Sequence, residues 1–402
     1  MEFVNKKSIL IFGGGKIGRS FIGQLFGLSG YEVVFVDVDT TLVGLLNKRH
    51  AYPVVIKSEE EKTITISNVR AINGIDGEAV IEEIENTSLM AVSVGKNALI
   101  NIVPLIARGL LSRYEKNPDM PLNIIIAENM RAADEFMREE LLKYLPTRYP
   151  LDNLVGLIET SIGKMVPLMT KEDLDNDPLA VFAEPYNDLI LDGEAFVGNI
   201  PDVKGLCPKK NMKAWVDRKA FIHNLGHATT AYYGNYKHPR AVYIYEVLQD
   251  VDVLLFTKKT MLQSAAVLHR IYPDDFTITD LQEHINDLLM RFQNKHLKDT
   301  IFRVGQDLPR KLGPDDRFMG IIRLAIENEM DYDQILLAMA YAFYFKEVDE
   351  NGEQSKPDLL FDKYFRKGLD FTIERICGLT SLKDSDVFEK LKGLVESLRI
   401  PR

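Results

Sequence analysis

The sequence predicts an α/β domain over residues 1–205 followed by an all-α domain over residues 206–402. In the first part, short β-prone apolar runs alternate with helical patterns, which is typical of a parallel sheet covered by helices. From Met212 onward the strand patterns disappear and helical periodicity dominates. The chain has 402 residues, 46% of them hydrophobic, so each domain can bury a core of its own.

Composition limits the classes of partner and compartment. The net charge of −10 argues against broad affinity for nucleic acid or for an anionic membrane surface. The longest apolar run, Ile335–Phe345, is shorter than the roughly 18 residues that suggest a membrane span. Cys207 and Cys377 are the only cysteines, which excludes a disulfide framework and favours a reducing cytoplasm. Residues 1–7 lack the pattern of a signal peptide, so we expect no export.

A glycine motif stands at the start of the first domain. The apolar run Ser8–Phe12 leads into Gly13, Gly15 and Gly18, which form G-x-G-x-x-G between a predicted strand and a predicted helix. Gly13 permits a tight turn, Gly15 lets the backbone approach a pyrophosphate, and Gly18 allows close packing of helix on strand. A second apolar run ends in Asp37, whose carboxylate would accept from the ribose hydroxyls and repel a 2′-phosphate. The pattern predicts a Rossmann-type domain that binds NAD rather than NADP.

Two further apolar runs extend this prediction to the rest of the first domain. Residues 89–95 and 122–129 read as buried parallel strands, and they end at Gly95 and Asn129. Ligands of open α/β sheets lie beyond the carboxyl ends of the strands, although Asn129 is equally suited to cap the helix that follows. Residues 157–200 mix short β-like runs with turns, which indicates a small β extension. The expected cofactor contacts are Gly13, Gly15, Lys16, Ile17, Gly18, Asp37, Gly95 and Asn129.

The stretch Asp217–His227 gathers proton-transferring side chains in the helical half. On a regular α-helix Lys219, His223 and His227 would lie at about 0°, 40° and 80° around the axis, with Asn224 near 140°. An alcohol dehydrogenase needs a base for the hydroxyl proton and donors for the developing alkoxide, and this face offers both. A lysine would need its pKa lowered to about 7–8. The alternative is that these side chains are structural. The histidines lack the H-E-x-x-H zinc motif, so we expect no metal.

A basic cluster follows in the same half of the chain. Arg303, Arg310, Lys311 and Arg317 are interrupted by Gly305, Pro309 and Pro314, which places them on loops or helix ends. Arginine forks match phosphate and carboxylate geometry, so the cluster suits capture of a substrate anion. A solvated surface is the alternative interpretation.

These motifs together resemble the polyol-specific long-chain dehydrogenases, the mannitol dehydrogenase family. The resemblance implies a zinc-independent, NAD-linked interconversion of mannitol 1-phosphate and fructose 6-phosphate in the cytoplasm. It implies Lys219 as general acid/base, Asn129 and Asn224 as donors to the substrate oxygen, and His227 as a substrate-placing residue; His223 is then expected to pack beside the site. We expect a monomer or a weak dimer. The segments that carry the resemblance are 15–23, 121–130, 176–179, 226–228 and 310–312.

Two departures from the family pattern leave the substrate open. Gly163-Lys164 stands where the family usually has Asp-Arg, and Gln306 stands where an arginine is expected. Another sugar phosphate or a sugar acid therefore remains an alternative substrate, and Lys164 joins Arg310, Lys311 and Arg317 as a predicted substrate-binding residue. Two rivals are a decarboxylating enzyme like 6-phosphogluconate dehydrogenase and an NAD-binding regulator without turnover.

Overall fold

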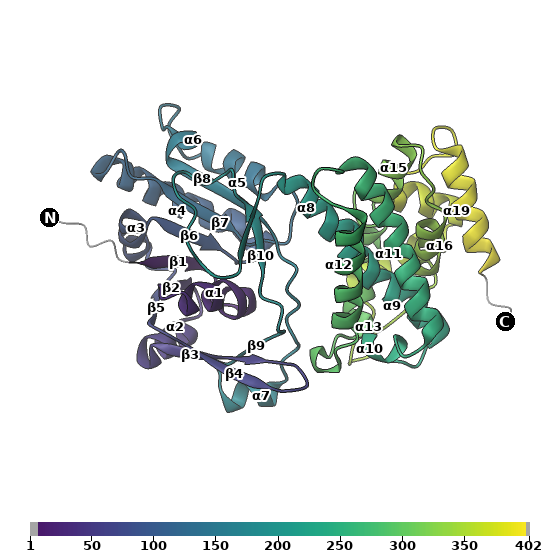
Figure 1. Cartoon of the computed structure of the whole chain (residues 1–402), viewed down its shortest axis with the longest axis horizontal. Coiled ribbons are helices and arrows are strands. Elements are labelled where there is room, and N and C mark those ends of the chain that lie inside the picture. Colours follow the sequence, from purple (N-terminus) through teal and green to yellow (C-terminus); the bar gives the residue numbers. More distant parts are fainter. Residues whose placement is uncertain (1–6, 399–402) are drawn as a thin grey trace. The chain divides into compact units, whose positions relative to one another are not determined.

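A computed structural model describes residues 7–398, so the first six residues of the predicted first domain and the last four of the second lie outside the description. The chain divides into two compact units, residues 1–216 and 217–402 (Figure 1). The division falls within helix α8 (Met212–Arg218), whereas the sequence predicts a boundary after residue 205. Among the described residues, no helix combines the length and apolar character needed to cross a membrane.

The first unit is built on an eight-stranded sheet with the strand order β11-β10-β8-β7-β6-β1-β2-β5. The strands from β8 to β5 pair in parallel, which confirms the predicted α/β fold. Strand β10 pairs antiparallel with β8, and β11 is parallel to β10, so part of the predicted β extension, together with the later strand β11, widens the edge of this sheet. The strand β9 of the predicted extension joins a second sheet instead. The strands are β1 (Ser8–Phe12), β2 (Glu32–Asp37), β5 (Val69–Asn73), β6 (Leu89–Val92), β7 (Leu122–Ile126), β8 (Val155–Ser161), β10 (Leu189–Asp192) and β11 (Leu206–Lys209).

Helices cover both faces of this sheet because its central strands are apolar on both sides. Alternate residues of β1 show the two faces: Ile9 and Ile11 pack with Phe21 of the glycine-motif helix, whereas Leu10 and Phe12 pack with Val103 of α4. A three-stranded sheet with the order β4-β3-β9 adds to the first face. The remaining elements are η1 (Gly18–Gly23), α1 (Gln24–Leu28), α2 (Thr40–Arg49), β3 (Ala51–Ile56), β4 (Lys62–Ser67), α3 (Gly77–Asn86), α4 (Lys96–Lys116), α5 (Ala133–Leu142), α6 (Leu151–Leu154), α7 (Lys171–Asn176) and β9 (Val181–Ala183).

The second unit is helical, as the sequence predicts, apart from one isolated bridge between Tyr243 and Thr300. Its central helix is α9 (Leu225–Lys237), which packs against α11, α13 and α16 (Figure 1). The π-helical segment η2 (Lys219–Asn224) leads directly into α9. The other helices are α10 (Ile244–Val247), α11 (Val251–Ile271), α12 (Ile278–Phe292), η3 (Lys295–Leu297), α13 (Ile301–Gly305), α14 (Leu308–Lys311), α15 (Met319–Glu327), α16 (Asp333–Ala342), α17 (Lys356–Phe365), α18 (Leu369–Thr372), η4 (Ile373–Cys377) and α19 (Ser385–Ser397).

Candidate functional site

The glycine motif forms a tight turn between β1 and the helix that follows it. Gly13 has a φ of +94°, and a Cβ there would lie 2.5 Å from the carbonyl oxygen of Ser93. A Cβ on Gly18 would lie 1.9 Å from the carbonyl oxygen of Gly13, so the helix approaches the turn more closely than any side chain permits. A Cβ on Gly15 would meet no atom within 4 Å. The turn therefore has no room for a side chain at Gly13 and Gly18, whereas the space beside Gly15 is free. A pyrophosphate that approaches the backbone requires this free space.

Alanine substitutions at Gly18 and Gly15 are expected to separate folding from cofactor binding. Gly18→Ala forces backbone atoms apart and is expected to destabilise the chain by about 1–3 kcal/mol, the usual cost of overpacking. Gly15→Ala is expected to leave the free energy of unfolding unchanged but to weaken NADH binding, because its methyl group would enter the space beside the turn. Denaturant unfolding and NADH fluorescence titration measure the two effects. Equal stability losses in both variants would contradict this assignment.

Asp37 at the end of β2 is tied to the same turn. Its Oδ2 accepts from the backbone N–H of Gly14 at 2.7 Å, and its Oδ1 accepts from the N–H of Asp39 at 2.9 Å. A carboxylate has about four lone-pair sites, so acceptor capacity remains for ribose hydroxyls. These contacts fit a dinucleotide, with its diol at Asp37 and its pyrophosphate beside Gly15. Lys16 and Ile17 open the helix at this point, and their side chains are exposed and half-buried respectively.

Asp37→Asn is expected to relax the discrimination against NADP. The amide oxygen can still accept from Gly14, although the bond from the N–H of Asp39 is lost, and the negative charge that opposes a 2′-phosphate disappears. The ratio of kcat/KM for NAD to that for NADP is expected to fall by about 10-fold or more, since juxtaposed like charges cost several kcal/mol. Steady-state kinetics with both cofactors give this ratio. An unchanged ratio would remove Asp37 from the cofactor site.

The loops after β6 and β7 meet through a buried carboxylate. Gly95 has a φ of +89°, its N–H donates to Oε1 of Glu128 at 2.9 Å, and a Cβ there would meet open space. Burial raises the pKa of Glu128, against the hydrogen bonds from the backbone of Gly95 and Val94. Asn129 follows and is exposed, but it is not the N-cap of α5, which is Ala132. The capping alternative for Asn129 therefore does not apply.

Lys164 is buried within the first unit. Its Nζ donates to Oδ1 of Asn187 at 2.6 Å and to Oε1 of Gln24 at 3.1 Å, and it lies 5.0 Å from the ring centre of Phe21. The ammonium group therefore contacts the helix that begins at Gly18. A substrate anion would have to share this ammonium group with two side-chain oxygens.

Lys219 begins η2 in the second unit. A π-helix winds more slowly than an α-helix, so the α-helical angles expected for Lys219, His223 and Asn224 do not apply across this segment. The Oγ of Ser264 on α11 donates to the carbonyl oxygen of Phe221 at 2.5 Å and so supports the altered backbone. Burial, assisted by the nearby charge of Arg317, lowers the pKa of Lys219 to about 8. Its amine therefore changes protonation state close to physiological pH.

His223 and His227 flank the aromatic ring of Phe292. The His227 ring stacks on Phe292 with centroids 4.5 Å apart and planes 8° apart, and His223 lies 5.6 Å from the same ring. Nε2 of His227 lies 3.3 Å from Oδ2 of Asp299. The pKa values of both histidines are held well below the ordinary value, first by burial and then by surrounding cations. Both imidazoles are therefore neutral at neutral pH.

The predicted basic cluster separates into buried and exposed members. Arg317 is buried, and its Nη1 donates to the carbonyl oxygen of Asn224 at 3.3 Å. Lys311 is buried as well, with its Nζ donating to the carbonyl oxygen of Val304 at 2.5 Å. Arg310 is half exposed and pairs with two carboxylates. The cations that lower the pKa of His227 are Arg303, Lys311, Arg317 and Arg291.

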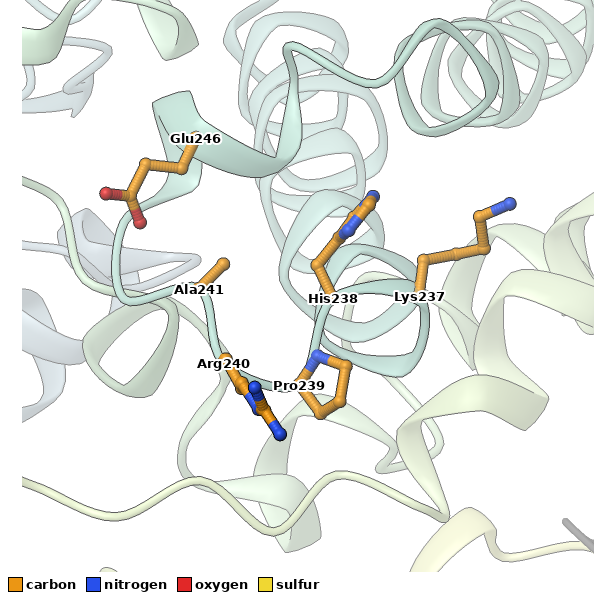
Figure 2. Close-up of a pocket in the computed structure, with 6 residues that line it drawn as sticks. All are labelled: Lys237, His238, Pro239, Arg240, Ala241 and Glu246. Atoms are coloured by element: carbon orange, nitrogen blue, oxygen red, sulfur yellow. The ribbon is translucent and has the colours of Figure 1, made fainter.

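A cavity of the second unit is lined by none of these cations. The cavity in Figure 2, about 520 Å³ in volume, is lined by Lys237, His238, Pro239, Arg240, Ala241 and Glu246. It lies at the far end of α9 from Lys219, roughly 27 Å along the helix at 1.5 Å per residue. Within residues 7–398, no group of three or more His, Cys, Asp and Glu side chains is placed to hold a metal ion.

Four residues belong to these arrangements although the sequence motifs do not single them out. Arg19 donates from Nε to the carbonyl oxygen of Gly14 at 2.6 Å, and Glu128 organises the turn at Gly95. Phe292 and Asp299 contact His227. Arg19 directly follows Gly18 and Glu128 directly precedes Asn129, so their position next to predicted site residues could have indicated them. Phe292 and Asp299 are distant in sequence from His227, and only the fold brings them to it.

Comparison with known proteins extends over almost the whole chain. Residues 7–205 match the family model described as the mannitol dehydrogenase Rossmann domain, and residues 211–393 match the mannitol dehydrogenase C-terminal domain. A mannitol-1-phosphate 5-dehydrogenase from Streptococcus mutans serotype c is 34% identical over 98% of this chain and 100% of its own length. A structure of mannitol 2-dehydrogenase from Pseudomonas fluorescens, in a ternary complex with NAD and D-mannitol, has a TM-score of 0.73 at 16% identity. It covers 98% of this chain and 92% of its own, and it supports the fold.

The two family models follow each other in the same order as the two units of the structure. The first includes the glycine turn and Asp37, and the second includes Lys219, Asn224 and His227. The chain therefore belongs to the mannitol dehydrogenase family of oxidoreductases.

Proposed function

We propose that this enzyme uses NAD to interconvert D-mannitol 1-phosphate and D-fructose 6-phosphate in the cytoplasm, as a monomer or weak dimer. The observation that carries the chemistry is a lysine with a pKa of about 8 that shares one continuous helix with Asn224 and His227. A general base works best when its pKa lies near the working pH. The choice of substrate rests on the 34% identity to a mannitol-1-phosphate 5-dehydrogenase.

The proposed proton transfer uses Lys219 in both directions. In oxidation the neutral amine takes the proton of the substrate hydroxyl, while the hydrogen on the same carbon leaves as hydride and the carbonyl forms. Bound NAD supplies the hydride acceptor. In reduction the ammonium form returns the proton to the carbonyl oxygen. Asn224 and Asn129 are the proposed donors to that oxygen as negative charge develops on it, a contribution typical of oxyanion donors.

Substrate placement is assigned to His227 and to the basic residues of the second unit. After burial, the causes that lower the pKa of His227 are cations, and a ligand that brings negative charge would offset them. Lys311 and Arg317 are the best supported anion-binding residues. Both are buried, and their charges lower the pKa of His227 or Lys219. Arg310 and Lys164 are proposed with them, and all four of these side chains also bind protein oxygens.

The two directions of reaction are expected to depend oppositely on pH. Oxidation needs neutral Lys219, so its rate is expected to rise with pH and level off above about 8. Reduction needs the ammonium form, so its rate is expected to fall as pH rises through the same value. The measurement is kcat/KM in each direction, which reports the free enzyme, between pH 6 and 10, an interval of about two units on either side of the inflection. Parallel profiles would contradict the assignment of Lys219.

A substrate screen tests the proposed function against its rivals. NADH oxidation is measured with fructose 6-phosphate, fructose and keto-uronates, and carbon dioxide release is measured with 6-phosphogluconate and NAD. We expect fructose 6-phosphate to be the preferred ketose and no carbon dioxide to form. Preference for a keto-uronate would move the substrate to a sugar acid. NADH binding without any turnover would favour a regulatory protein.

A further inference from the structure

Asp299 is a buried carboxylate between η3 and α13 whose two oxygens face different partners. Its side chain is 5% exposed. Oδ1 accepts from the guanidinium of Arg303. Oδ2 lies 3.3 Å from Nε2 of His227. The carboxylate thus connects a guanidinium to an imidazole that lies two helical turns beyond Lys219.

The facing atoms of His227 and Asp299 have no alternative partner among residues 7–398. Both Nε2 and Oδ2 are buried, and neither makes a hydrogen bond to another described group. Their 3.3 Å separation is an ion-pair distance that lacks the direction of a hydrogen bond. A buried polar atom without a partner costs free energy, so the two atoms gain by pairing. Such bonds are often long without ligand and tighten in the substrate complex.

Two features fix the chemical state of the imidazole. The stack on Phe292 holds the plane of the ring. Burial and the surrounding cations keep the pKa of His227 well below its ordinary value, so the ring carries a single proton. A carboxylate can only accept a hydrogen bond, which favours that proton on the nitrogen facing Asp299. Nδ1 then keeps its lone pair.

We propose that Asp299 is a positioning residue that holds His227 as the Nε2–H tautomer, so that Nδ1 accepts a hydrogen bond from a substrate hydroxyl. Arg303 contributes by binding Oδ1, which leaves Oδ2 for the imidazole. The inference rests on the proposed function in one respect, namely that His227 contacts a hydroxyl of the substrate. The tautomer itself is a property of the free enzyme.

Asp299→Asn is expected to reverse the tautomer. A guanidinium can only donate, so the amide oxygen of the asparagine must face Arg303. The amide NH₂ group then faces Nε2 of His227, which becomes the acceptor, and the ring proton moves to Nδ1. An N–H would replace the lone pair that receives the substrate hydroxyl. The substitution preserves the shape of the side chain, but it reverses the hydrogen-bond polarity toward His227 and removes the negative charge that pairs with Arg303.

The direct test is the ¹⁵N NMR spectrum of His227 in histidine-labelled, ligand-free full-length enzyme, assigned with a His227→Asn variant. We expect a pyrrole-type Nε2 and a pyridine-type Nδ1 in the unsubstituted enzyme, and the opposite assignment in Asp299→Asn. A protonated Nδ1 in the unsubstituted enzyme would overturn the proposal. Because this spectrum requires no variant of Asp299, poor folding of Asp299→Asn would not prevent the test.

Kinetics supply the second readout, with a matched control in the same unit. Asp299→Asn is expected to lower kcat/KM about 10- to 100-fold, mainly through KM, because a hydroxyl held throughout the reaction affects ground and transition states alike. His238 and Asp250 form another pair, with Nε2 2.7 Å from Oδ2, so Asp250→Asn should retain nearly normal kinetics. Equal losses in both variants would indicate a structural role and overturn the proposal. If the unsubstituted enzyme were inactive on both mannitol 1-phosphate and fructose 6-phosphate, the proposed substrate would be refuted. The ¹⁵N NMR spectrum would still decide the tautomer of His227.

Discussion

Lys219→Ala is expected to lower kcat by about 10²- to 10⁴-fold, the usual contribution of a general acid/base, and to leave NADH binding intact. The reason is that Lys219 is the side chain on the η2–α9 helix whose pKa is brought to about 8. The proposed cofactor-binding residues, the glycine turn and Asp37, are not changed by truncating the lysine. Stopped-flow reduction and NADH fluorescence titration measure the two quantities.

A matched lysine and chemical rescue give this prediction its controls. Lys213 on α8 is exposed, and Lys213→Ala is expected to retain normal kcat. Small primary amines added to Lys219→Ala are expected to restore part of the rate, because they return a base of suitable pKa to the vacated space. Loss of NADH binding together with a lowered unfolding midpoint would show that Lys219 is structural.

Asn224→Ala is expected to lower kcat by about 10²- to 10³-fold, as removal of one oxyanion donor typically does. Asn224 ends the π-helical segment, and its carbonyl oxygen is held by Arg317 at 3.3 Å, which fixes the backbone from which the amide projects. The loss should appear in kcat more than in KM, because the charge on the substrate oxygen is largest in the transition state. Pre-steady-state measurement of hydride transfer isolates this step.

Asn235 provides the comparison for Asn224. It lies on α9, the helix that follows η2 directly, and its Nδ2 donates to Oε1 of Glu347 at 2.6 Å. Asn235→Ala is therefore expected to reduce the free energy of unfolding while folded enzyme keeps its normal kcat. If Asn224→Ala behaved in the same way, with reduced stability and unchanged hydride transfer, its assignment as an oxyanion donor would be wrong.

The fold was predictable wherever the evidence is local in the sequence. Runs such as Leu122–Ile126 are apolar on both faces, which indicates buried parallel strands, and the structure confirms them. The partners of the small sheet were not predictable, because β3 pairs with β9 through Val54 and Val181, far apart in the chain. Such a pairing depends on how the domain closes and leaves no periodic pattern within either strand.

The sequence suggests residues for the candidate site, which stay a prediction, but it does not give their geometry. Lys219, Asn224 and His227 stand out because amine, amide and imidazole recur at helical spacing. The helix rule assumes 100° per residue, however, and the π-helical segment departs from it. Asp299 was missed because its relation to His227 exists only after α9 and the segment before α13 are packed together. The sequence also did not distinguish Arg310, which is half exposed and pairs with Asp307, from Lys311 and Arg317, which are buried.

The most direct test of the central claim is to identify the product when fructose 6-phosphate and NADH are incubated with the enzyme. Reduction of the ketone creates either mannitol 1-phosphate or its epimer glucitol 6-phosphate, which NMR spectroscopy distinguishes. The proposed function predicts stoichiometric NADH oxidation with mannitol 1-phosphate as product, and loss of this reaction in Lys219→Ala. Formation of the glucitol epimer, or unchanged NADH in the presence of fructose 6-phosphate, would contradict it.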